Sequence, residues 1–414
     1  MERLKKKLKA VLPQALKTLE WLALSLITGG VCGLVGTLFH FALDKAGEWF
    51  GSNSFMLYLM PVAGIIIVLI YKLLRMPLSM GTDQVFEATR GQNGVPWQMA
   101  PLIFISTFLT HLTGGSAGRE GAALQLGASV ACVEGRLFKL NKNGMHIIEM
   151  CGMSALFSAL FGTPIAAAFF AIEVVDVGMV RYKALLPCVI SALVANLLSG
   201  IFGVEPTRFA LGEALAGNGI LDYLKVGALA LLTGLVAILF CETMHFAQRK
   251  AKKLVPNEFI RIIVSAVSVI ALSLILGTRD YNGAGMVVIK RAIGGEAQPL
   301  AWLIKLAFTV ITLSGGFKGG EIVPSFFVGA CFGCTIGSIL GLDPGLAAAL
   351  GMIGVFCGVT NAPAASMLIA CEMFSGKYFV FFALTVAVSF FAGGKTSLYH
   401  SQKYLESKYI WDGE

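Results

Sequence analysis

The chain has 414 residues, of which 56% are apolar and only 14% are charged, and its formal net charge is +8. Soluble domains carry about a quarter charged residues, so this composition excludes an ordinary soluble globular protein. The apolar runs are long and do not alternate with polar residues, which favours an all-α polytopic membrane protein over a β-barrel. No soluble domain presents the basic residues, so membrane lipid is the expected partner and nucleic acid is not.

The first half of the chain contains six predicted apolar helices. Residues 1–16 predict a short basic amphipathic helix on the cytoplasmic surface, and residues 17–203 the first transmembrane repeat. A polar stretch with Asp44, Glu48 and Asn53 marks an external loop, and a further short helix is expected after a break at Gly81, with Thr82 or Asp83 as its cap. The apolar helices are predicted at Trp21–Leu43, Phe55–Leu74, Pro96–Leu112, Gly144–Phe161, Pro164–Val175 and Tyr182–Phe202.

The second half repeats this organisation. An external loop is predicted at residues 204–218, a second transmembrane repeat at 219–394, and a C-terminal amphipathic helix with a cytoplasmic tail at 395–414. Residues 277–297 predict a polar loop between two spans. The apolar helices are predicted at Gly219–Phe246, Phe259–Leu276, Leu300–Leu313, Val323–Leu340, Leu346–Val359, Pro363–Phe374 and Phe379–Phe391.

Basic clusters set the expected orientation in the membrane. They lie at the ends of apolar spans, at Lys5–Lys9, Lys72–Arg75, Arg249–Lys253 and Lys403–Lys408. Cytoplasmic loops carry an excess of lysine and arginine, so both termini are expected in the cytoplasm and the protein in the cell (plasma) membrane. The basic N-terminus lacks a small-residue cleavage pattern, so no cleavable signal is expected.

Metal and cofactor sites are not indicated. The five histidines lie far apart, and the nine cysteines are scattered through apolar runs. Cys331 and Cys334 form a CxxC within an apolar segment, where small buried residues are the favoured interpretation. We therefore expect no metal and no cofactor.

A glycine-rich stretch, Thr113–Gly121 (the first glycine-rich segment), separates two apolar runs. Four glycines in nine residues do not favour a regular helix, and Arg119 and Glu120 are costly in lipid unless they face a cavity or a partner. A helix-like run follows at once. Because the first amides of a helix are unpaired and the helix dipole is positive there, this pattern predicts a helix N-terminus that faces an anion.

The pattern recurs about 200 residues later, as expected of an internal repeat. Ser314–Glu321 (the second glycine-rich segment) repeats the hydroxyl, the glycines and the final glutamate, with Gly320 and Glu321 matching Arg119 and Glu120. A second match, in the same order, aligns Pro164–Glu173 with Pro363–Glu372. Paired broken helices in two repeats indicate a transporter with its site where the repeats meet.

The intramembrane carboxylates are the main candidate functional groups. Glu120 and Glu321 begin equivalent helices, and an ionisable group inside a membrane favours function. One interpretation is that each side chain only caps its helix. The functional hypothesis is that it competes with an anion for the amides and takes up a proton when displaced. Arg119 is expected to pair within the helix bundle. Glu173 and Glu372 are expected to accept structural hydrogen bonds from backbone.

Four motifs resemble the CLC family of anion channels and anion/proton antiporters. They are Gly118–Gly121 (GREG), Gly319–Pro324 (resembling GGxFxP), Ser79–Asp83 and Leu398–Tyr399. Their order agrees with that family along nearly the whole chain. The resemblance implies the CLC inverted-repeat fold and a homodimer with one pore per subunit. By position alone, Met80 reads as a flexible core filler and Tyr399 as an interfacial tyrosine.

The departures from these motifs resemble the fluoride-exporting branch of the family. Met80 replaces the pore serine, Ile322 replaces a phenylalanine, and Glu321 stands where the motif is usually apolar. The inner proton-transfer glutamate of chloride/proton antiporters falls at Val174 and is absent. The resemblance implies that Glu120 gates and carries protons, with Glu321 as a second carboxylate. It implies an anion path formed by Met80, Gly81, Phe86, Gly118, Arg119, Gly121, Gly320, Ile322 and Tyr399.

These observations predict a transporter, not an enzyme, that exports cytoplasmic fluoride in exchange for protons. Three alternatives remain: a chloride/proton antiporter, a passive CLC-type anion channel, and a membrane receptor or scaffold without transport. The missing inner glutamate counts against the first, and the paired intramembrane carboxylates count against the third. Sequence separates antiporter from channel poorly, because channels of this family can retain the gating glutamate.

Overall fold

The structure is a computed structural model that describes residues 2–91, 94–212, 219–376 and 378–408, with side chains from residue 16 onward. Its fold is all-α, as predicted, and the described chain contains two strands of two residues each, which pair with each other. Parts of the expected loop 204–218 and of the tail 395–414 lie outside the described residues, at 213–218 and 409–414.

The first half of the described chain folds into eight helices. The bounds of these helices lie close to those predicted from the apolar runs, except at the N-terminus. The helices are α1 (Glu2–Ser52), α2 (Met60–Leu73), α3 (Thr82–Ala88), α4 (Met99–Leu112), α5 (Glu120–Leu137), α6 (Lys142–Phe161), α7 (Pro164–Glu173) and α8 (Leu185–Ile201), with short 3-10 turns at Ser54–Leu59 and Tyr182–Ala184.

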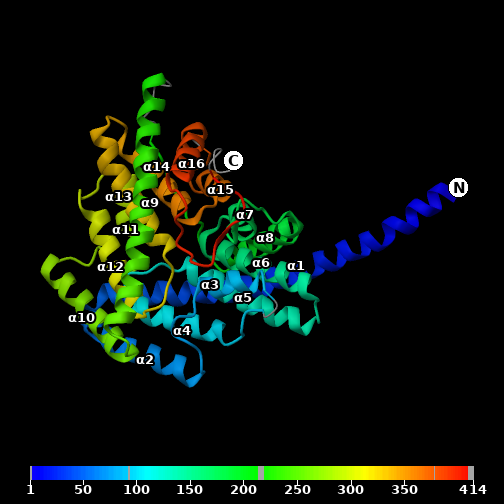
Figure 1. Cartoon of the computed structure of the whole chain (residues 1–414), viewed down its shortest axis with the longest axis horizontal. Helices are drawn as coiled ribbons and strands as arrows, with labels where there is room; N and C mark the ends of the chain where they lie inside the picture. The colour runs from blue at the N-terminus through cyan, green and yellow to red at the C-terminus, as the bar shows by residue number, and fades with distance from the viewer. Residues whose placement is uncertain (1, 92–93, 213–218, 377, 409–414) are drawn as a thin grey trace.

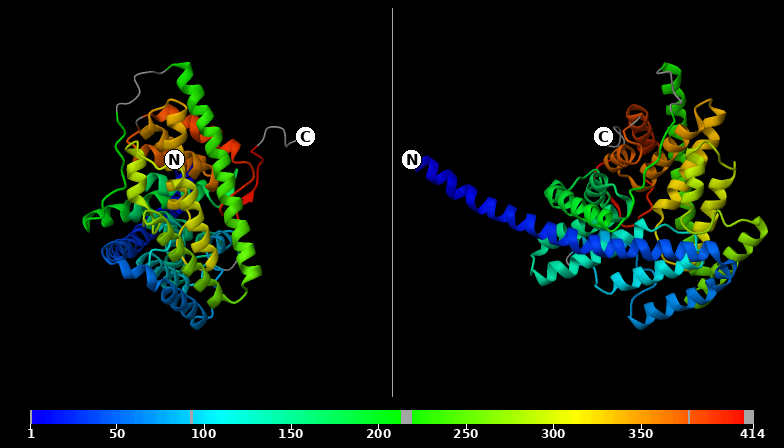
Figure 2. Two further views of the ribbon diagram at one scale, coloured as in Figure 1. Left: turned by 90° about the vertical axis from the view of Figure 1, so that its left-hand side faces the viewer. Right: turned by 180° about the vertical axis from the view of Figure 1, so that it is seen from behind.

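The second half supplies eight helices in the same order, which supports the internal repeat. The expected polar loop at 277–297 was wrong in part, because it contains α11, the counterpart of α3. The helices are α9 (Ile220–Leu254), α10 (Glu258–Leu276), α11 (Met286–Ile293), α12 (Ala301–Gly315), α13 (Ile322–Ile339), α14 (Pro344–Thr360), α15 (Pro363–Met373) and α16 (Phe379–Ala392). Figure 1 shows α14, α15 and α16 above the first four helices, and Figure 2 shows α9 along one side of the molecule.

The N-terminal helix is longer than predicted. Residues 2–16 are helical but continue without a break into the first span, and the expected loop at Asp44 is also wrong, since α1 ends only at Ser52. Polar side chains there support the helix instead of ending it. His40 contacts Asp44 at 2.9 Å and Lys45 contacts Glu48 at 2.9 Å, at the spacings that stabilise helices.

The C-terminal segment is not helical in its described part, 395–408, so the predicted C-terminal helix was wrong there. Its strand β2 (Lys403–Tyr404) pairs in parallel with β1 (Asp176–Val177). Backbone groups that a helix would pair locally are bound elsewhere: the Leu405 amide donates to Val177 O at 3.0 Å. Long-range partners therefore decide the conformation of this segment.

The described chain is built to cross a membrane. Seven stretches are long and apolar enough to do so: Leu16–Ser52, Ser54–Leu73, Lys142–Phe161, Tyr182–Ile201, Ile220–Leu254, Glu258–Leu276 and Ile322–Ile339. Close helix crossings are made by glycines. Gly127 of α5 packs on Gly152 of α6, and Gly329 of α13 packs on Gly351 of α14, so both repeats use the same small-residue contact.

Helices α7 and α15, one from each repeat, are joined by reciprocal hydrogen bonds: a carboxylate of each accepts from backbone amides of the other. Glu173, at the end of α7, accepts from the amides of Ala364 (3.0 Å) and Ala365 (2.8 Å) at the start of α15. Glu372 of α15 accepts in return from the first amides of α7, at 3.1 and 2.8 Å. The expectation of structural hydrogen bonding to backbone is confirmed for both. The donors belong to the opposite repeat, so each carboxylate satisfies amides that a helix leaves unpaired.

Candidate functional site

The two glycine-rich segments meet at the centre of the molecule. Gly118 and Gly320 exchange two hydrogen bonds, each with an N–O distance of 2.7 Å, in an antiparallel bridge. The two glycine-rich segments therefore run in opposite directions where they pair. The bridge brings together the starts of α5 and α13, which carry Glu120 and Glu321.

Glycine is required at this crossing because the backbones approach closely. A Cβ atom on Gly121 would lie 2.8 Å from the Gly320 Cα and 3.5 Å from Oε2 of Glu321. The first contact is with backbone, which cannot move aside as a side chain can. The second shows that the Glu321 carboxylate rests against the first turn of α5, one residue from Glu120.

We expect Gly121→Ala to disrupt this crossing, with little folded protein and no anion transport. The matched control is Gly200→Ala in α8, where an added Cβ meets nothing within 4 Å. The control should fold normally, since alanine is the better helix former by about 1 kcal/mol. Yield and apparent Tm of the detergent-solubilised proteins measure the effect. Equal behaviour of the two variants would contradict the argument.

Glu120 is buried, with 1% of its surface exposed. Its Oε2 accepts from the Arg119 amide at 2.9 Å, and its Oε1 lies 3.5 Å from Arg119 Nε. The Arg119 guanidinium also contacts Asp44 at 3.1 Å and His40 at 3.0 Å on α1. The expected pairing of Arg119 within the bundle is confirmed, and it connects Glu120 to Asp44, which is half exposed.

A cavity of about 430 Å³ lies beside the crossing. Four of the predicted site residues line it: Met80, Gly81, Glu321 and Tyr399. Glu120, Gly118, Gly121 and Gly320 form the crossing next to it, Ile322 and Phe86 are buried, and Arg119 faces α1. The lining also includes Gln248, Lys252 and Arg261, so the cavity opens near the basic cluster Arg249–Lys253.

The segment before α3 forms one wall of this cavity. The prediction that Thr82 or Asp83 caps α3 was wrong: Gly81 is the N-cap, and its amide donates to Oε1 of Gln84 at 2.6 Å. Thr82 accepts from Gln125 Nε2 at 3.2 Å, and Asp83 accepts from the Ser401 amide at 2.8 Å. The longer side chain of Gln84 reaches back to the cap, as in a capping box. An anion that binds the Gly81 amide therefore has to displace Gln84.

Tyr399 lies inside the protein and not at a membrane interface. It is 4% exposed, and among the described residues its hydroxyl has no hydrogen-bond partner. Its ring packs edge-to-face on Phe86, with centroids 4.8 Å apart and an interplanar angle of 73°. A buried hydroxyl without a partner is costly, so this group is free to donate to an acceptor in the cavity.

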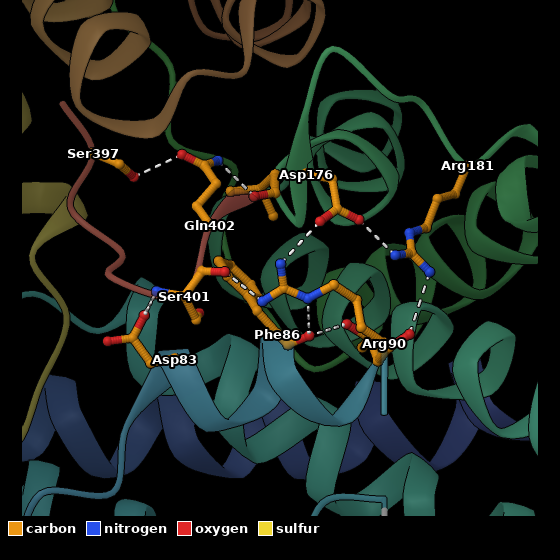
Figure 3. A network of polar contacts seen from close by, with 10 residues as sticks. Asp83, Phe86, Arg90, Asp176, Arg181, Ser397, Ser401 and Gln402 are labelled. Carbon is orange, nitrogen blue, oxygen red and sulfur yellow. Dashed lines mark hydrogen bonds and ion pairs between the residues drawn. The ribbon is translucent and has the colours of Figure 1, made fainter. Parts of the chain in front are cut away.

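A polar network holds the loop that carries Tyr399 (Figure 3). Arg90, just after α3, donates to Asp176 at 2.9 Å and to the Ser401 carbonyl, and Asp176 also accepts from Arg181 at 2.6 Å. Gln402 donates to Val174 O at 2.7 Å, next to the end of α7. The segment after the tyrosine is therefore fixed to the first repeat, whereas the Leu398 amide before it donates to Val359 O of the second repeat at 2.9 Å.

Sequence reasoning missed Lys318 and Gln84. Lys318 occupies a position that the repeat alignment treats as free, but its Nζ donates to the carbonyls of Leu78 (2.5 Å) and Met80 (2.9 Å) on the cavity wall. The cost of an ionisable group within a membrane, which drew attention to Glu120, applies equally to this lysine and could have found it. Gln84 carried no comparable signal.

Comparisons with known proteins agree with this geometry. Residues 63–394 match the sequence profile of the family described as "Voltage gated chloride channel". A "Chloride/fluoride channel protein" of Pseudomonas syringae pv. tomato is 33% identical over 397 residues, covering 94% of this chain and 88% of that protein. An "H(+)/Cl(-) exchange transporter ClcA" of Vibrio cholerae is 24% identical over 87% of this chain and 83% of its own length. The crystal structure of a CLC-type fluoride/proton antiporter superposes with a TM-score of 0.90, at 32% identity, over 94% of this chain and 99% of that one.

Proposed function

The chain belongs to the voltage-gated chloride channel (CLC) family, and from this premise we propose that it is a fluoride/proton antiporter that exports cytoplasmic fluoride. The observation that carries the proposal is the bridge between Gly118 and Gly320. It places two carboxylate-bearing helix starts side by side, beside a cavity lined by Met80 and Tyr399. Two carboxylates at an anion-binding crossing suit the exchange of an anion for a proton.

The preference for fluoride over chloride has three supports. Glu321 lines the cavity at a motif position that is usually apolar, and Met80 lines it in place of a serine. Val174, which takes the position of the inner proton-transfer glutamate, is fully buried. The relatives at 33% and 32% identity bear fluoride in their descriptions. A chloride/proton antiporter is the second candidate, favoured by the match to the exchange transporter of Vibrio cholerae.

The proposed mechanism begins at the cavity. Its opening lies beside Lys252, and the basic cluster Arg249–Lys253 marks the cytoplasmic side. Fluoride enters there and reaches the helix starts after Gly81 and Gly320, where amides, the Tyr399 hydroxyl and the positive edge of Phe86 replace part of its water shell. Glu120 occupies the anion position when ionised and leaves it when protonated. Arg119, which already contacts Glu120, and the half-exposed Asp44 connect this carboxylate to the external side, where the proton is exchanged.

The assembly and orientation belong to the same proposal. The protein is a homodimer in the cell membrane, with one path per subunit and both termini in the cytoplasm. The support is the family membership and the distribution of basic residues, since cytoplasmic segments are rich in lysine and arginine.

The deciding experiment measures efflux from liposomes that contain the purified protein, with fluoride and chloride run in parallel and internal pH recorded. We expect fluoride efflux to drive proton uptake, so that the interior acidifies even against a pH gradient, with little chloride efflux. Equal chloride efflux would replace the proposal with the chloride/proton antiporter. Fluoride efflux without proton movement would make the protein a channel.

A further inference from the structure

Lys318 is the charged side chain that joins the second glycine-rich segment to the wall of the cavity before α3. We propose that Lys318 is a positioning residue, which fixes the backbone of Leu78–Met80 so that the Gly81 amide is presented to the transported anion. The identity of that anion rests on the proposed function, but the role of the lysine does not.

The contacts of Lys318 link residues 240 positions apart in the sequence. Its Nζ lies 2.5 Å from Leu78 O and 2.9 Å from Met80 O, and 4.9 Å from the centroid of the Tyr71 ring. All three partners come from the first repeat. The lysine side chain lines the same cavity as Met80 and Gly81. Its hydrogen bonds to the backbone of Leu78 and Met80 therefore lie at the candidate anion site.

Because a peptide group is rigid, binding its carbonyl oxygen also fixes the direction of its N–H. A trans peptide is planar, so its carbonyl and its N–H point in opposite directions. When Lys318 binds the carbonyl of Met80, the N–H of the same peptide, which belongs to Gly81, points away from the lysine, toward Gln84. The carbonyl of Leu78 fixes the Ser79 amide in the same way. Carbonyl oxygens that would repel an anion are thereby paired with a cation.

A simple counter-ion role for Lys318 fits the structure less well. Among the described residues no ion pair within 4.0 Å joins Lys318 to Glu321, although both line the cavity. The Lys318 ammonium instead donates hydrogen bonds to the backbone carbonyls of Leu78 and Met80. Removing the lysine therefore affects mainly the backbone of Leu78–Met80, and affects the environment of the Glu321 carboxylate less.

Lys305 provides a matched control. Its Nζ also donates to two backbone carbonyls, Tyr281 O at 3.1 Å and Gly283 O at 2.6 Å, and it is more deeply buried than the half-buried Lys318, with 0% exposure. It lies on α12 and does not line the cavity formed by the described residues. A general cost of losing a lysine that binds backbone carbonyls applies to both residues, whereas an effect on anion affinity is expected for Lys318 alone.

The test measures the KM and maximum rate of anion efflux from liposomes for the wild type, Lys318→Met, Lys318→Gln and Lys305→Met. We expect Lys318→Met to raise the KM at least tenfold, a larger factor than any fall in maximum rate. Lys318→Gln, whose amide still donates to a carbonyl, should raise it at least threefold, and Lys305→Met should leave it within twofold.

Three results would overturn the proposal: a KM within twofold of wild type for Lys318→Met, a loss of maximum rate alone, or an equal rise for Lys305→Met. If Lys318→Met does not fold, Lys318→Gln decides, and a KM within twofold of wild type contradicts the role. The series is run with fluoride and with chloride. A wild type that carries only chloride refutes the proposed fluoride function, while the chloride KM values still test Lys318.

Discussion

Replacing Glu120 with glutamine is expected to abolish proton coupling, lowering fluoride-driven proton uptake by about 100-fold or more, the range seen when a proton-transferring side chain is removed. Glutamine keeps the size of the side chain and stays neutral, so it can neither carry a proton nor compete as an anion for the helix amides. Its amide oxygen still accepts from the Arg119 amide, which Oε2 of Glu120 contacts at 2.9 Å. Folding should therefore survive, and the measurement is internal pH during fluoride efflux from liposomes.

The matched control for this prediction is Glu134→Gln on the same helix. Glu134 is also buried, at 7% exposure, and accepts from Thr28 at 2.6 Å, but it lies four turns from the crossing near the other end of α5. Glu134→Gln should keep proton-coupled transport. Coupling that persists in Glu120→Gln would rule out Glu120 as the proton carrier, and an equal loss in both variants would mean that the effect is not specific to Glu120.

The second large effect is on stability. Glu173→Ala and Glu372→Ala should each destabilise the folded protein by about 3 kcal/mol or more. Each removes a carboxylate that accepts two backbone hydrogen bonds and leaves two amides of the opposite repeat unpaired. Hydrogen bonds to charged groups contribute about 1.5–3 kcal/mol each. The apparent Tm of the solubilised protein measures the loss, and both variants should lower it similarly because the contacts are reciprocal.

Glu242→Ala, which removes an exposed carboxylate of α9, is the control and should change stability by about 0.5 kcal/mol or less. One result would reverse the structural interpretation of Glu173. This residue directly precedes Val174, where the resemblance places the proton-transfer glutamate of chloride/proton antiporters. A Glu173→Ala protein with wild-type Tm but no proton coupling would make Glu173 a proton carrier.

Local sequence patterns predicted much of the fold. Apolar runs located most of the helices because membrane burial demands a continuous stretch of apolar side chains. The two glycine-rich segments were recognised as helix starts for the same local reason, since glycine interrupts a helix and the amides after it stay free. The repeat then predicted that Glu120 and Glu321 are equivalent.

Local patterns failed where distant partners decide the conformation. The loop expected at Asp44 is helix, and this aspartate pairs with Arg119, which lies 75 residues away in the sequence. The helix expected in the C-terminal segment is replaced by a strand, because β1 supplies backbone partners from more than 200 residues away. A polar or charged stretch shows that a segment avoids lipid, but not whether water or another part of the protein satisfies it.

The sequence by itself determined the membrane class, the two repeats, the glycine-rich helix starts and the candidate carboxylates. These follow from composition and from interactions within a few residues along the chain. Only the tertiary structure decided which groups meet: Gly118 with Gly320, Glu173 with the start of α15, and Lys318 with the carbonyls of Leu78 and Met80. Such pairings depend on how whole helices pack, because a donor buried in a membrane must find its acceptor within the protein, however distant in sequence.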